Sequence, residues 1–327
     1  MIPRGNRTRG QASLCVVRIL VLSLLMTTGL WSQSPPVTDI AFAPGGKWLL
    51  ACSQEGLKIF SWPDLKLQKT VEASFVNLHC LEFSPDGKLL AVGGGNPAEK
   101  GVVEVFSWPA CVSRMKLTEH GDSVISLVWQ GNKNLVSASL DRSLILWDIT
   151  SKKTRRTFQG HSRGVRAACI LKSGELVTGG QDQSVRVWNV ESGELIRSLN
   201  QHSKPLHSIA VCPVVGPRQM VATAAGDRTI RFWQPTIGRM MRYIRLPSEP
   251  LDIKWLGESR MVASCVDGHA RVIDTENVKI TREIPVVQGW AYAVAVHPDG
   301  AGVALGGSNG RLCRLEWNPR SESLRLR

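Results

Sequence analysis

The 327-residue sequence lacks the features of several common protein classes. After residue 36, no stretch of ten or more residues carries a helical stripe of apolar side chains, so strands rather than helices are expected there. No low-complexity tract interrupts the chain. With 43% hydrophobic and 20% charged residues, the chain can instead bury a sizeable core as one large globular β domain.

Motifs for metals, nucleotides and disulfides are also missing. The eight cysteines form no Cys-x-x-Cys pair and are too sparse for a disulfide scaffold, so we expect them to be small buried hydrophobic residues. The seven histidines include no His-x-x-x-His pair, and we expect neither a metal nor another cofactor. Residues 93–101 are glycine-rich but lack the Gly-x-x-x-x-Gly-Lys-Ser/Thr pattern of a phosphate-binding loop. We expect a lengthened turn between two strands there.

What the sequence does contain is a repeat. His120, His161 and His202 are spaced 41 residues apart, and each is followed by an aspartate and then, six residues later, by a tryptophan. These pairs are Asp141 and Trp147, Asp182 and Trp188, and Asp227 and Trp233. A fixed period in the forties with strand-like patterning is the signature of a radially repeating all-β structure.

Each repeating unit consists of four short runs separated by turns. In one such unit, apolar runs at residues 124–129, 134–139 and 144–147 are followed by a more polar run at residues 154–158. Alternating segments rich in Val, Ile, Leu, Thr and Trp between turn residues predict strands. One unit therefore corresponds to a four-stranded sheet.

Several motifs recur at fixed places in these units. Gly160 and His161 open one unit, and residues 185–189 of that unit have the sequence Val-Arg-Val-Trp-Asn. A Ser-Pro-Asp-Gly-Lys turn at residues 84–88 combines a proline, which presets φ, with a glycine, which accepts a positive φ. Together these motifs resemble the WD-repeat (Trp-Asp repeat) family of β-propellers. With the amino-terminal segment described below, the chain resembles an exported member of bacterial type. The resemblance covers nearly everything after residue 36.

The resemblance implies an all-β fold, a single propeller of seven four-stranded antiparallel blades over residues 37–327. The blades are expected to open near residues 37, 75, 120, 161, 202, 248 and 286, at about 42 residues per blade. Residues 34–36 leave little room for an amino-terminal strand, because proline cannot donate to a ladder. We expect residues 323–327 to form the outer strand of blade 7, and the ring to close by packing between blades rather than by strand exchange.

The first 36 residues do not belong to the ring. Four arginines precede an apolar run at residues 19–26, and no acidic residue occurs before Asp39. A basic head followed by about a dozen apolar residues is typical of a secretory signal and too short for a comfortable transmembrane span. We therefore expect export to the periplasm, the cell envelope or the medium. Two alternatives remain open: an uncleaved membrane anchor, or translation from Met26, which leaves a cytoplasmic protein.

A histidine, a hydroxyl residue, an aspartate and a tryptophan recur together in three blades, and we call each set a tetrad. The resemblance implies a structural hydrogen-bond relay from carboxylate to imidazole to hydroxyl to indole, which satisfies each buried polar group. A nucleophile triad is the alternative, but an active site is needed once and this set occurs three times. We therefore assign no catalytic residue. The tetrads are His120, Ser137, Asp141 and Trp147; His161, Thr178, Asp182 and Trp188; and His202, Thr223, Asp227 and Trp233.

The positive charge of the chain points to acidic partners. The formal net charge of +13 falls to about +9 without the four amino-terminal arginines. The resemblance places the aspartate turns and histidine loops on one rim, where we expect a basic patch of Arg142, Arg163, Lys204 and Arg228; scattered solvated charges are the alternative. Nucleic acid is not expected, because no aromatic residues interleave with these charges. A membrane is expected only through an uncleaved amino-terminal segment.

Two functions from different classes remain. The first is a non-catalytic interaction scaffold whose rim loops bind a protein or peptide partner, with no small-molecule substrate. The second is an exported propeller enzyme resembling quinoprotein dehydrogenases, whose repeat is faintly echoed by residues 190–195. An enzyme requires unpaired titratable residues that converge on the central channel, or a metal site. The sequence indicates neither, and the scaffold is preferred.

Overall fold

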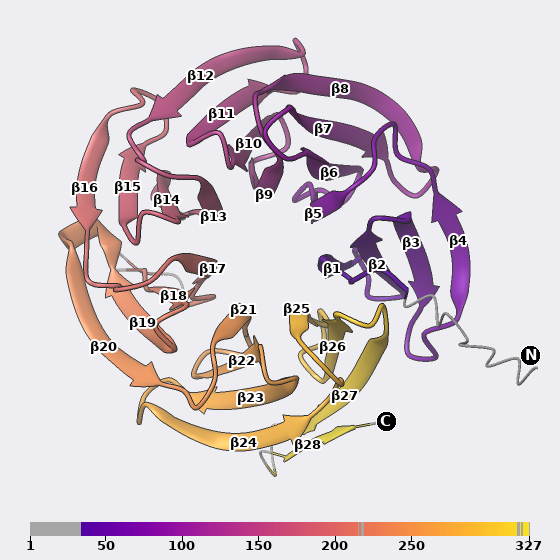
Figure 1. The fold of residues 1–327 in the computed structure, drawn as a ribbon, viewed down its shortest axis with the longest axis vertical. Coiled ribbons are helices and arrows are strands. Elements are labelled where there is room, and N and C mark those ends of the chain that lie inside the picture. Colours follow the sequence, from indigo (N-terminus) through magenta and orange to yellow (C-terminus); the bar gives the residue numbers. More distant parts are fainter. Residues whose placement is uncertain (1–33, 215, 217–218, 319–320, 322, 327) are drawn as a thin grey trace, which may run out of the picture. The chain divides into compact units, whose positions relative to one another are not determined.

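Seven four-stranded antiparallel sheets follow one another in chain order around a common axis, as the blades of a β-propeller (Figure 1). The structure is a computed structural model and describes residues 34–327 except 215, 217, 218, 319, 320, 322 and 327. The expectations of a signal, an anchor or a start at Met26 lie outside the described residues. Within the described ranges, no helix has the length and apolar character to cross a membrane. The prediction of seven four-stranded blades is confirmed.

Each blade uses four consecutive strands, of which the first is innermost and the fourth outermost (Figure 1). Blade 1 contains β1 (Asp39–Phe42), β2 (Trp48–Ser53), β3 (Gly56–Ser61) and β4 (Leu67–Val71). Blade 2 contains β5 (Leu78–Phe83), β6 (Leu89–Asn96), β7 (Lys100–Ser107) and β8 (Val112–His120). Blade 3 contains β9 (Val124–Gln130), β10 (Asn134–Ser139), β11 (Ser143–Asp148) and β12 (Lys153–Gln159). Blade 4 contains β13 (Val165–Ile170), β14 (Glu175–Gly180), β15 (Val185–Asn189) and β16 (Leu195–Leu199).

The remaining blades repeat this order. Blade 5 contains β17 (Leu206–Val211), β18 (Val221–Ala225), β19 (Thr229–Gln234) and β20 (Arg239–Arg245), with the short 3₁₀ helix η1 (Pro235–Ile237) between its last two strands. Blade 6 contains β21 (Pro250–Trp255), β22 (Arg260–Cys265), β23 (His269–Asp274) and β24 (Lys279–Pro285). Blade 7 contains β25 (Ala291–Val296), β26 (Gly302–Gly307), β27 (Leu312–Asn318) and β28 (Ser323–Leu326).

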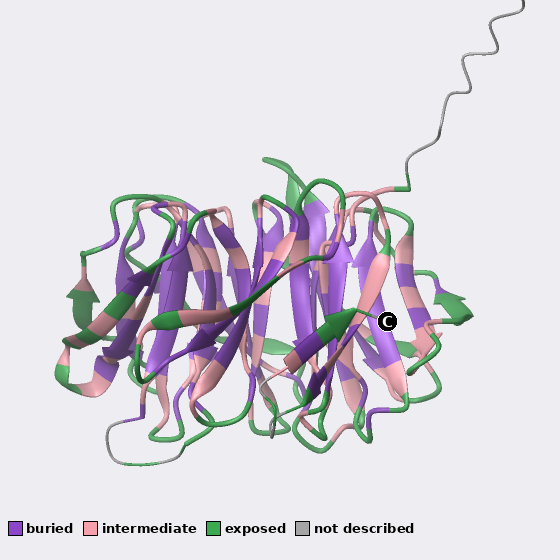
Figure 2. Ribbon diagram, turned by 90° about the horizontal axis from the view of Figure 1, so that it is seen from below, coloured by how far each residue is buried: buried purple, intermediate pink, exposed green. Residues whose placement is uncertain are grey.

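Burial explains why the runs of each unit differ in polarity. The middle strands are covered on both faces by neighbouring blades, whereas the outermost strands face water (Figure 2). Five of the six residues of β10 are buried, so the strand is apolar or small on both of its faces. In β12, exposed and half-buried residues alternate, and Phe158 is the one buried side chain. The more polar fourth run of each unit is thus the solvent-facing edge of its blade.

The tryptophans of the tetrads fill the space between adjacent blades. Trp147, Trp188 and Trp233 are the largest fully buried side chains of the described residues. Trp147 belongs to the same buried cluster as Val103 of blade 2, and Trp233 to the same cluster as Val187 of blade 4. Replacing such a side chain by alanine typically costs about 3–5 kcal/mol. Each tetrad therefore lies at a joint between two blades.

The ring closes where blade 7 meets blade 1. Blade 7 takes all four strands from the carboxy-terminal part of the chain, with β28 paired to β27. The Val37 N–H donates to the Gly307 carbonyl at 3.1 Å. The His297 ring packs against Phe42 and Trp62, with ring centroids 4.9 and 5.9 Å away. For the described residues, the prediction of closure by packing with a carboxy-terminal outer strand is confirmed.

The expectation of a lengthened turn at residues 93–101 is wrong in part. Strands β6 and β7 continue into this segment and leave only residues 97–99 as the turn. The glycines permit this extension. A Cβ on Gly93 would lie 2.7 Å from Cys80 Sγ, and one on Gly94 would lie 2.2 Å from the Asn77 carbonyl oxygen. Only glycine lets the strand pass so close to its neighbours.

Candidate functional site

One edge of the propeller carries the loops that the sequence singled out. Because the strands of a blade are antiparallel, the start of β9, the turn between β10 and β11 and the end of β12 lie at the same edge. The same holds in blades 4 and 5, so the histidine loops and the aspartate turns share this edge. We call it the histidine rim. The loops at both edges of the ring are mostly exposed or half-buried (Figure 2).

In blade 3 the tetrad side chains form a continuous hydrogen-bonded chain. His120 Nδ1 lies 2.8 Å from Asp141 Oδ2, and His120 Nε2 lies 2.7 Å from Ser137 Oγ. The Trp147 indole N–H donates to the same serine oxygen at 2.8 Å. Because the indole is only a donor, the serine hydroxyl can give its own proton to Nε2, and Nδ1–H then donates to Asp141. Every polar group is satisfied with a neutral imidazole.

Blades 4 and 5 repeat this geometry. The histidine–carboxylate distances are 3.0 and 2.9 Å, the histidine–hydroxyl distances are 2.8 Å in both blades, and the indole–hydroxyl distances are 2.9 and 2.8 Å. The groups come from His161, Thr178, Asp182 and Trp188 in blade 4 and from His202, Thr223, Asp227 and Trp233 in blade 5. The structure thus brings together every residue of the three predicted tetrads.

The tetrads match a nucleophile triad in the order of their groups but not in access. Ser137, Thr178 and Thr223 each have an exposed fraction of 0%. A nucleophilic oxygen must reach the atom that it attacks, and these hydroxyls instead hold an indole N–H and an imidazole. Each tetrad connects an aspartate turn to the strands of its blade, and the blade 3 tetrad takes its histidine, His120, from the end of β8 in blade 2.

The turn aspartates are held in their charged form. Burial alone raises the pKa of a carboxyl group, but hydrogen bonds from the histidine rings and the Ser or Thr hydroxyls outweigh burial and hold the pKa of Asp141, Asp182 and Asp227 well below its usual range. Burial also lowers the pKa of His202 against the attraction of Asp227. A charged aspartate beside a neutral histidine fits the hydrogen-bond pattern above.

Blade 6 keeps the turn aspartate but uses an arginine to hold it, and we call this set the arginine clasp. Arg271 Nη1 and Nη2 donate to Asp267 at 2.9 and 2.5 Å, and Nη2 also donates to Glu283 at 2.7 Å. Asp267, His269 and Glu283 place ligand atoms within 4.8 Å of one another, as a metal site would. The guanidinium of Arg271, only 1% exposed, already binds both carboxylates and supplies a positive charge between them.

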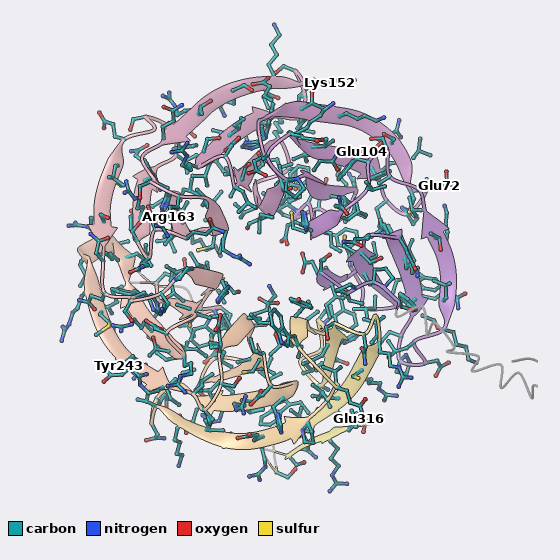
Figure 3. The ribbon with its side chains drawn as sticks, in the orientation of Figure 1. Glu72, Glu104, Lys152, Arg163, Tyr243 and Glu316 are labelled. Atoms are coloured by element: carbon teal, nitrogen blue, oxygen red, sulfur yellow. The ribbon has the colours of Figure 1, made fainter. Side chains whose placement is uncertain are left out.

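Blade 2 holds its entry loop with a glutamate that the sequence analysis missed. Glu104 lies within blade 2 (Figure 3) and is 2% exposed. Its carboxylate accepts hydrogen bonds from the Ser74 N–H at 2.8 Å and from the Ser113 hydroxyl at 2.5 Å. The available signal was a single acidic residue inside the apolar run at residues 102–106.

The basic residues expected on the histidine rim all lie there, around blades 3 to 5. Arg142 and Arg228 directly follow the turn aspartates, whereas Arg163 (Figure 3) and Lys204 belong to the histidine loops. All four side chains are exposed, and none forms a hydrogen bond or ion pair with another described residue. We call these four residues the basic crescent, since their charges remain available to a partner.

The innermost strands line a central channel with a volume of about 1110 Å³. Strands β5, β9, β13, β17, β21 and β25 each contain a β-bulge, in which their second residue has no partner on the neighbouring strand. A bulge redirects a side chain out of the regular alternation. The bulged residues line the channel at its histidine-rim end, and we call them the bulge tier: His79, Ile125, Arg166, His207, Leu251 and Tyr292.

Titratable side chains converge on the channel, which the sequence did not indicate. Beside the bulge tier, Asp39, Glu82, Asp252 and Lys254 line the cavity. Desolvation by the channel wall raises the pKa of the half-buried Asp39 to about 7, and that of Glu82, whose side chain is exposed in the channel, to about 7 as well, against the attraction of Lys254. Each residue comes from a different repeat or from alternate positions of one strand. No local sequence pattern therefore predicts this cluster of titratable residues in the channel.

Two of these carboxylates link neighbouring blades. Asp39 Oδ2 accepts a hydrogen bond from the Leu81 N–H of blade 2 at 2.9 Å. Asp252 Oδ2 accepts one from the Val294 N–H of blade 7 at 3.0 Å. Both aspartates thus stabilise the inner wall of the ring.

An aromatic pair, with one exposed and one half-buried ring, lies beside the channel mouth. The rings of Trp290 and Tyr292 meet edge to face with centroids 5.6 Å apart, and both residues line the channel. Trp290 is 47% exposed. Large aromatic side chains in such positions are frequent anchors for protein partners.

Comparison with known proteins places this geometry in a family. A family model described as "WD domain, G-beta repeat" matches residues 26–61, 65–97, 111–148, 152–189 and 193–234. Most matched ranges begin at the outermost strand of one blade and end near the second or third strand of the next. The fold and these matches define a β-propeller built from WD repeats. The chain belongs to the WD-repeat family.

Several curated relatives are similar to parts of the chain. UBP9-binding protein bun62 of Schizosaccharomyces pombe is 27% identical over 128 residues, which are 37% of this chain and 23% of the relative. The guanine nucleotide-binding protein subunit beta of Oryza sativa subsp. indica is 26% identical over 185 residues, 52% of this chain and 46% of the relative. Periodic tryptophan protein 2 of Arabidopsis thaliana is 29% identical over 125 residues, 37% of this chain and 13% of the relative. The match spans less than half the length of each relative.

Proposed function

We propose that the protein is a non-catalytic interaction scaffold whose histidine rim binds a protein or peptide partner of acidic character. One observation carries the proposal: the basic crescent consists of exposed, unpaired cations beside a channel mouth with an exposed tryptophan. Desolvated aromatic anchors combined with charges that steer an oppositely charged partner are typical of recognition surfaces. A relative named as a UBP9-binding protein supports a protein as the class of partner.

The proposal is tested by reversing the charges of the basic crescent. The variant R142E/R163E/K204E/R228E and the wild type are used for proximity labelling and pull-down in the native host. A matched control reverses four exposed lysines on turns at the opposite edge: Lys66, Lys133, Lys152 and Lys172. We expect the crescent variant to lose its main partner and the control to keep it, with unchanged thermal unfolding in both. Equal capture of the partner by all three proteins would show that the basic crescent does not bind it.

The channel carboxylates give one reason to test an enzyme as the second candidate. Perturbed pKa values in a cavity are enriched at active sites, and the Glu82 carboxylate lines the channel without a hydrogen bond to another described residue. Asp39 and Asp252, in contrast, are occupied by backbone N–H groups. Absorbance spectra and metal analysis of protein purified from the native host address this candidate. A bound quinone or a stoichiometric metal would contradict the scaffold function and support an enzyme.

We also propose that the protein is an exported member of the family. Support comes from the amino-terminal sequence alone, with four arginines ahead of an apolar run and no acidic residue. The full chain and a chain starting at Met26, both with a carboxy-terminal tag, are compared by cell fractionation. Export predicts that the full chain leaves the cytoplasm and the shortened chain stays there. Identical distribution of the two chains would contradict export.

A further inference from the structure

The bulge tier mixes basic and apolar side chains at one level of the channel. His79, Arg166 and His207 come from β5, β13 and β17, the inner strands of blades 2, 4 and 5. Ile125, Leu251 and Tyr292 supply the apolar and aromatic positions. Each of the six residues occupies the bulge at the second position of its own inner strand. The ring therefore presents them at one level around one opening. A ligand that enters here meets cations and apolar surface together.

Arg166 is the only arginine of the bulge tier, and its side chain has no hydrogen-bond or ion-pair partner among the described residues. Its Nε is buried without a hydrogen-bond partner, and its guanidinium makes no ion pair within the described residues. Burial lowers the pKa of Arg166, yet an arginine stays charged at any physiological pH. An unpaired, partly desolvated charge is costly. An anionic group from a ligand would supply the missing partner.

Glu249 acts on Arg166 without pairing with it. The charge of Glu249 attracts the Arg166 guanidinium, but its Oε1 lies 2.6 Å from His207 Nε2 and forms its direct contact there. The Nδ1 atom of His207 is buried and has no partner. The Glu249 side chain is 36% exposed and lines the channel. An incoming anion would therefore meet the Arg166 charge and, close by, a carboxylate that opposes it.

We propose that the channel mouth binds one acidic side chain of a peptide partner, with Arg166 as its anchor and Glu249 as a charge that limits its affinity. The inference rests on the proposed scaffold function and names the chemistry that the partner brings to the rim. The planar fork of arginine binds carboxylate and phosphate oxygens in pairs. Glutamate, aspartate and phosphoserine share this chemistry. Ile125, Leu251 and Trp290 then contact apolar residues next to the acidic one.

A peptide array tests the preference for an acidic group. Peptides with random flanks are printed in three versions, with glutamate, phosphoserine or glutamine at the centre, and probed with the purified protein. The best sequences are then measured in solution by fluorescence anisotropy, alongside a single-stranded oligouridine. We expect the acidic versions to bind at least about tenfold more tightly than the glutamine version, as a hydrogen-bonded charge pair requires. The ratio of phosphoserine to glutamate distinguishes the two sources of the anion.

Variants that remove either the Arg166 cation or the Glu249 anion should change peptide binding in opposite directions. Arg166→Gln should abolish the preference for the acidic versions, and Arg166→Lys should retain part of it, because lysine keeps the charge but not the fork. Glu249→Gln should strengthen binding of the acidic versions about two- to fivefold by removing the opposing charge. Arg142→Gln, on the same rim but outside the channel, serves as the matched control. All variants are checked by thermal unfolding.

Three results would overturn the inference. The first is the absence of any preference for the acidic versions in the wild type. The second is an unchanged preference in a folded Arg166→Gln variant. The third is oligouridine binding that exceeds peptide binding and depends on Arg166. If Arg166→Gln still captures the host partner while the crescent reversal does not, the anchor is wrong and the scaffold function stands. If neither variant affects capture, the proposed binding through the histidine rim is contradicted.

Discussion

Blades 3 to 5 and blade 6 hold the same turn aspartate with different chemistry. In blades 3 to 5, a histidine and a Ser or Thr hydroxyl connect the aspartate to a buried indole. In blade 6, with Ile273 in the place of the tryptophan, Arg271 binds Asp267 directly and adds Glu283 from the outermost strand. The comparison shows that a relay of histidine and hydroxyl groups and a charged clasp can both hold the turn aspartate.

The two solutions differ in how their stability should respond to change. In a tetrad the aspartate is held charged, and the hydrogen-bond pattern satisfies its other groups in their neutral forms. The clasp contains a cation with 1% exposure, whose carboxylate partners are 33% and 40% exposed. Removing one member of the tetrad leaves unsatisfied polar atoms, whereas removing the carboxylates of the clasp leaves a buried charge. The clasp should therefore be the more sensitive site.

The largest effect is expected when the clasp loses both carboxylates. In D267N/E283Q, the Arg271 guanidinium stays buried without a counter-charge, and unfolding in urea should show a loss of about 3–5 kcal/mol. Glu55→Gln is the control, because neither member of the Glu55–Lys58 pair is buried (49% and 30% exposed) and pairs in contact with water contribute about 0–1 kcal/mol. Equal stability of the two variants would show that the clasp does not hold blade 6.

A smaller effect is expected when a tetrad loses its aspartate. In Asp227→Ala, His202 and the backbone N–H groups of Ser203 and Thr229 lose their acceptor. We expect a loss of about 1–3 kcal/mol in urea unfolding. Asp141→Ala should cost less, because the Asp141 side chain is 18% exposed and water can replace it, whereas that of Asp227 is 4% exposed. The reverse order would contradict burial as the cause.

Local patterns made the tetrads and the seven blades predictable from sequence. The histidines recur every 41 residues and each aspartate precedes its tryptophan by six residues, because the blades repeat the same order of turns and strands. Such spacing fixes which residues meet within one blade. The family resemblance also placed the basic crescent on the histidine rim, since Arg142 and Arg228 follow the turn aspartates, and Arg163 and Lys204 belong to the histidine loops.

The clasp and the channel could not be predicted in the same way. Arg271 reaches Glu283 on the neighbouring strand, and nothing in the spacing distinguishes this pair from exposed charges. Arg166 and His207 face the channel only because a bulge shifts the register at the second residue of their strands. They meet only because the ring brings distant repeats to one opening. Contacts of this kind depend on closure of the whole ring.

The pH dependence of stability should separate the tetrads from their aspartate-free variants. The folded pKa of Asp182 is depressed, so its contribution is complete above the unfolded value near 4 and is lost as the pH falls below it. Between pH 5 and pH 3, the stability advantage of the wild type over Asp182→Ala should shrink by about 1 kcal/mol. Urea midpoints at several pH values measure the difference. A constant difference would mean that Asp182 is not held charged in the fold.

The smallest effect is expected from zinc, which tests whether the clasp is a metal site. Asp267, His269 and Glu283 have suitable spacing, but Arg271 already supplies the positive charge between the two carboxylates. Excess Zn²⁺ should therefore leave the thermal midpoint of the wild type unchanged within about 1 °C. In Arg271→Met the same three residues lose their cation, and zinc should raise the midpoint by binding only the folded state. Stabilisation of the wild type by zinc would instead make blade 6 a metal-binding blade, and its difference from blades 3 to 5 one of function rather than of scaffold chemistry.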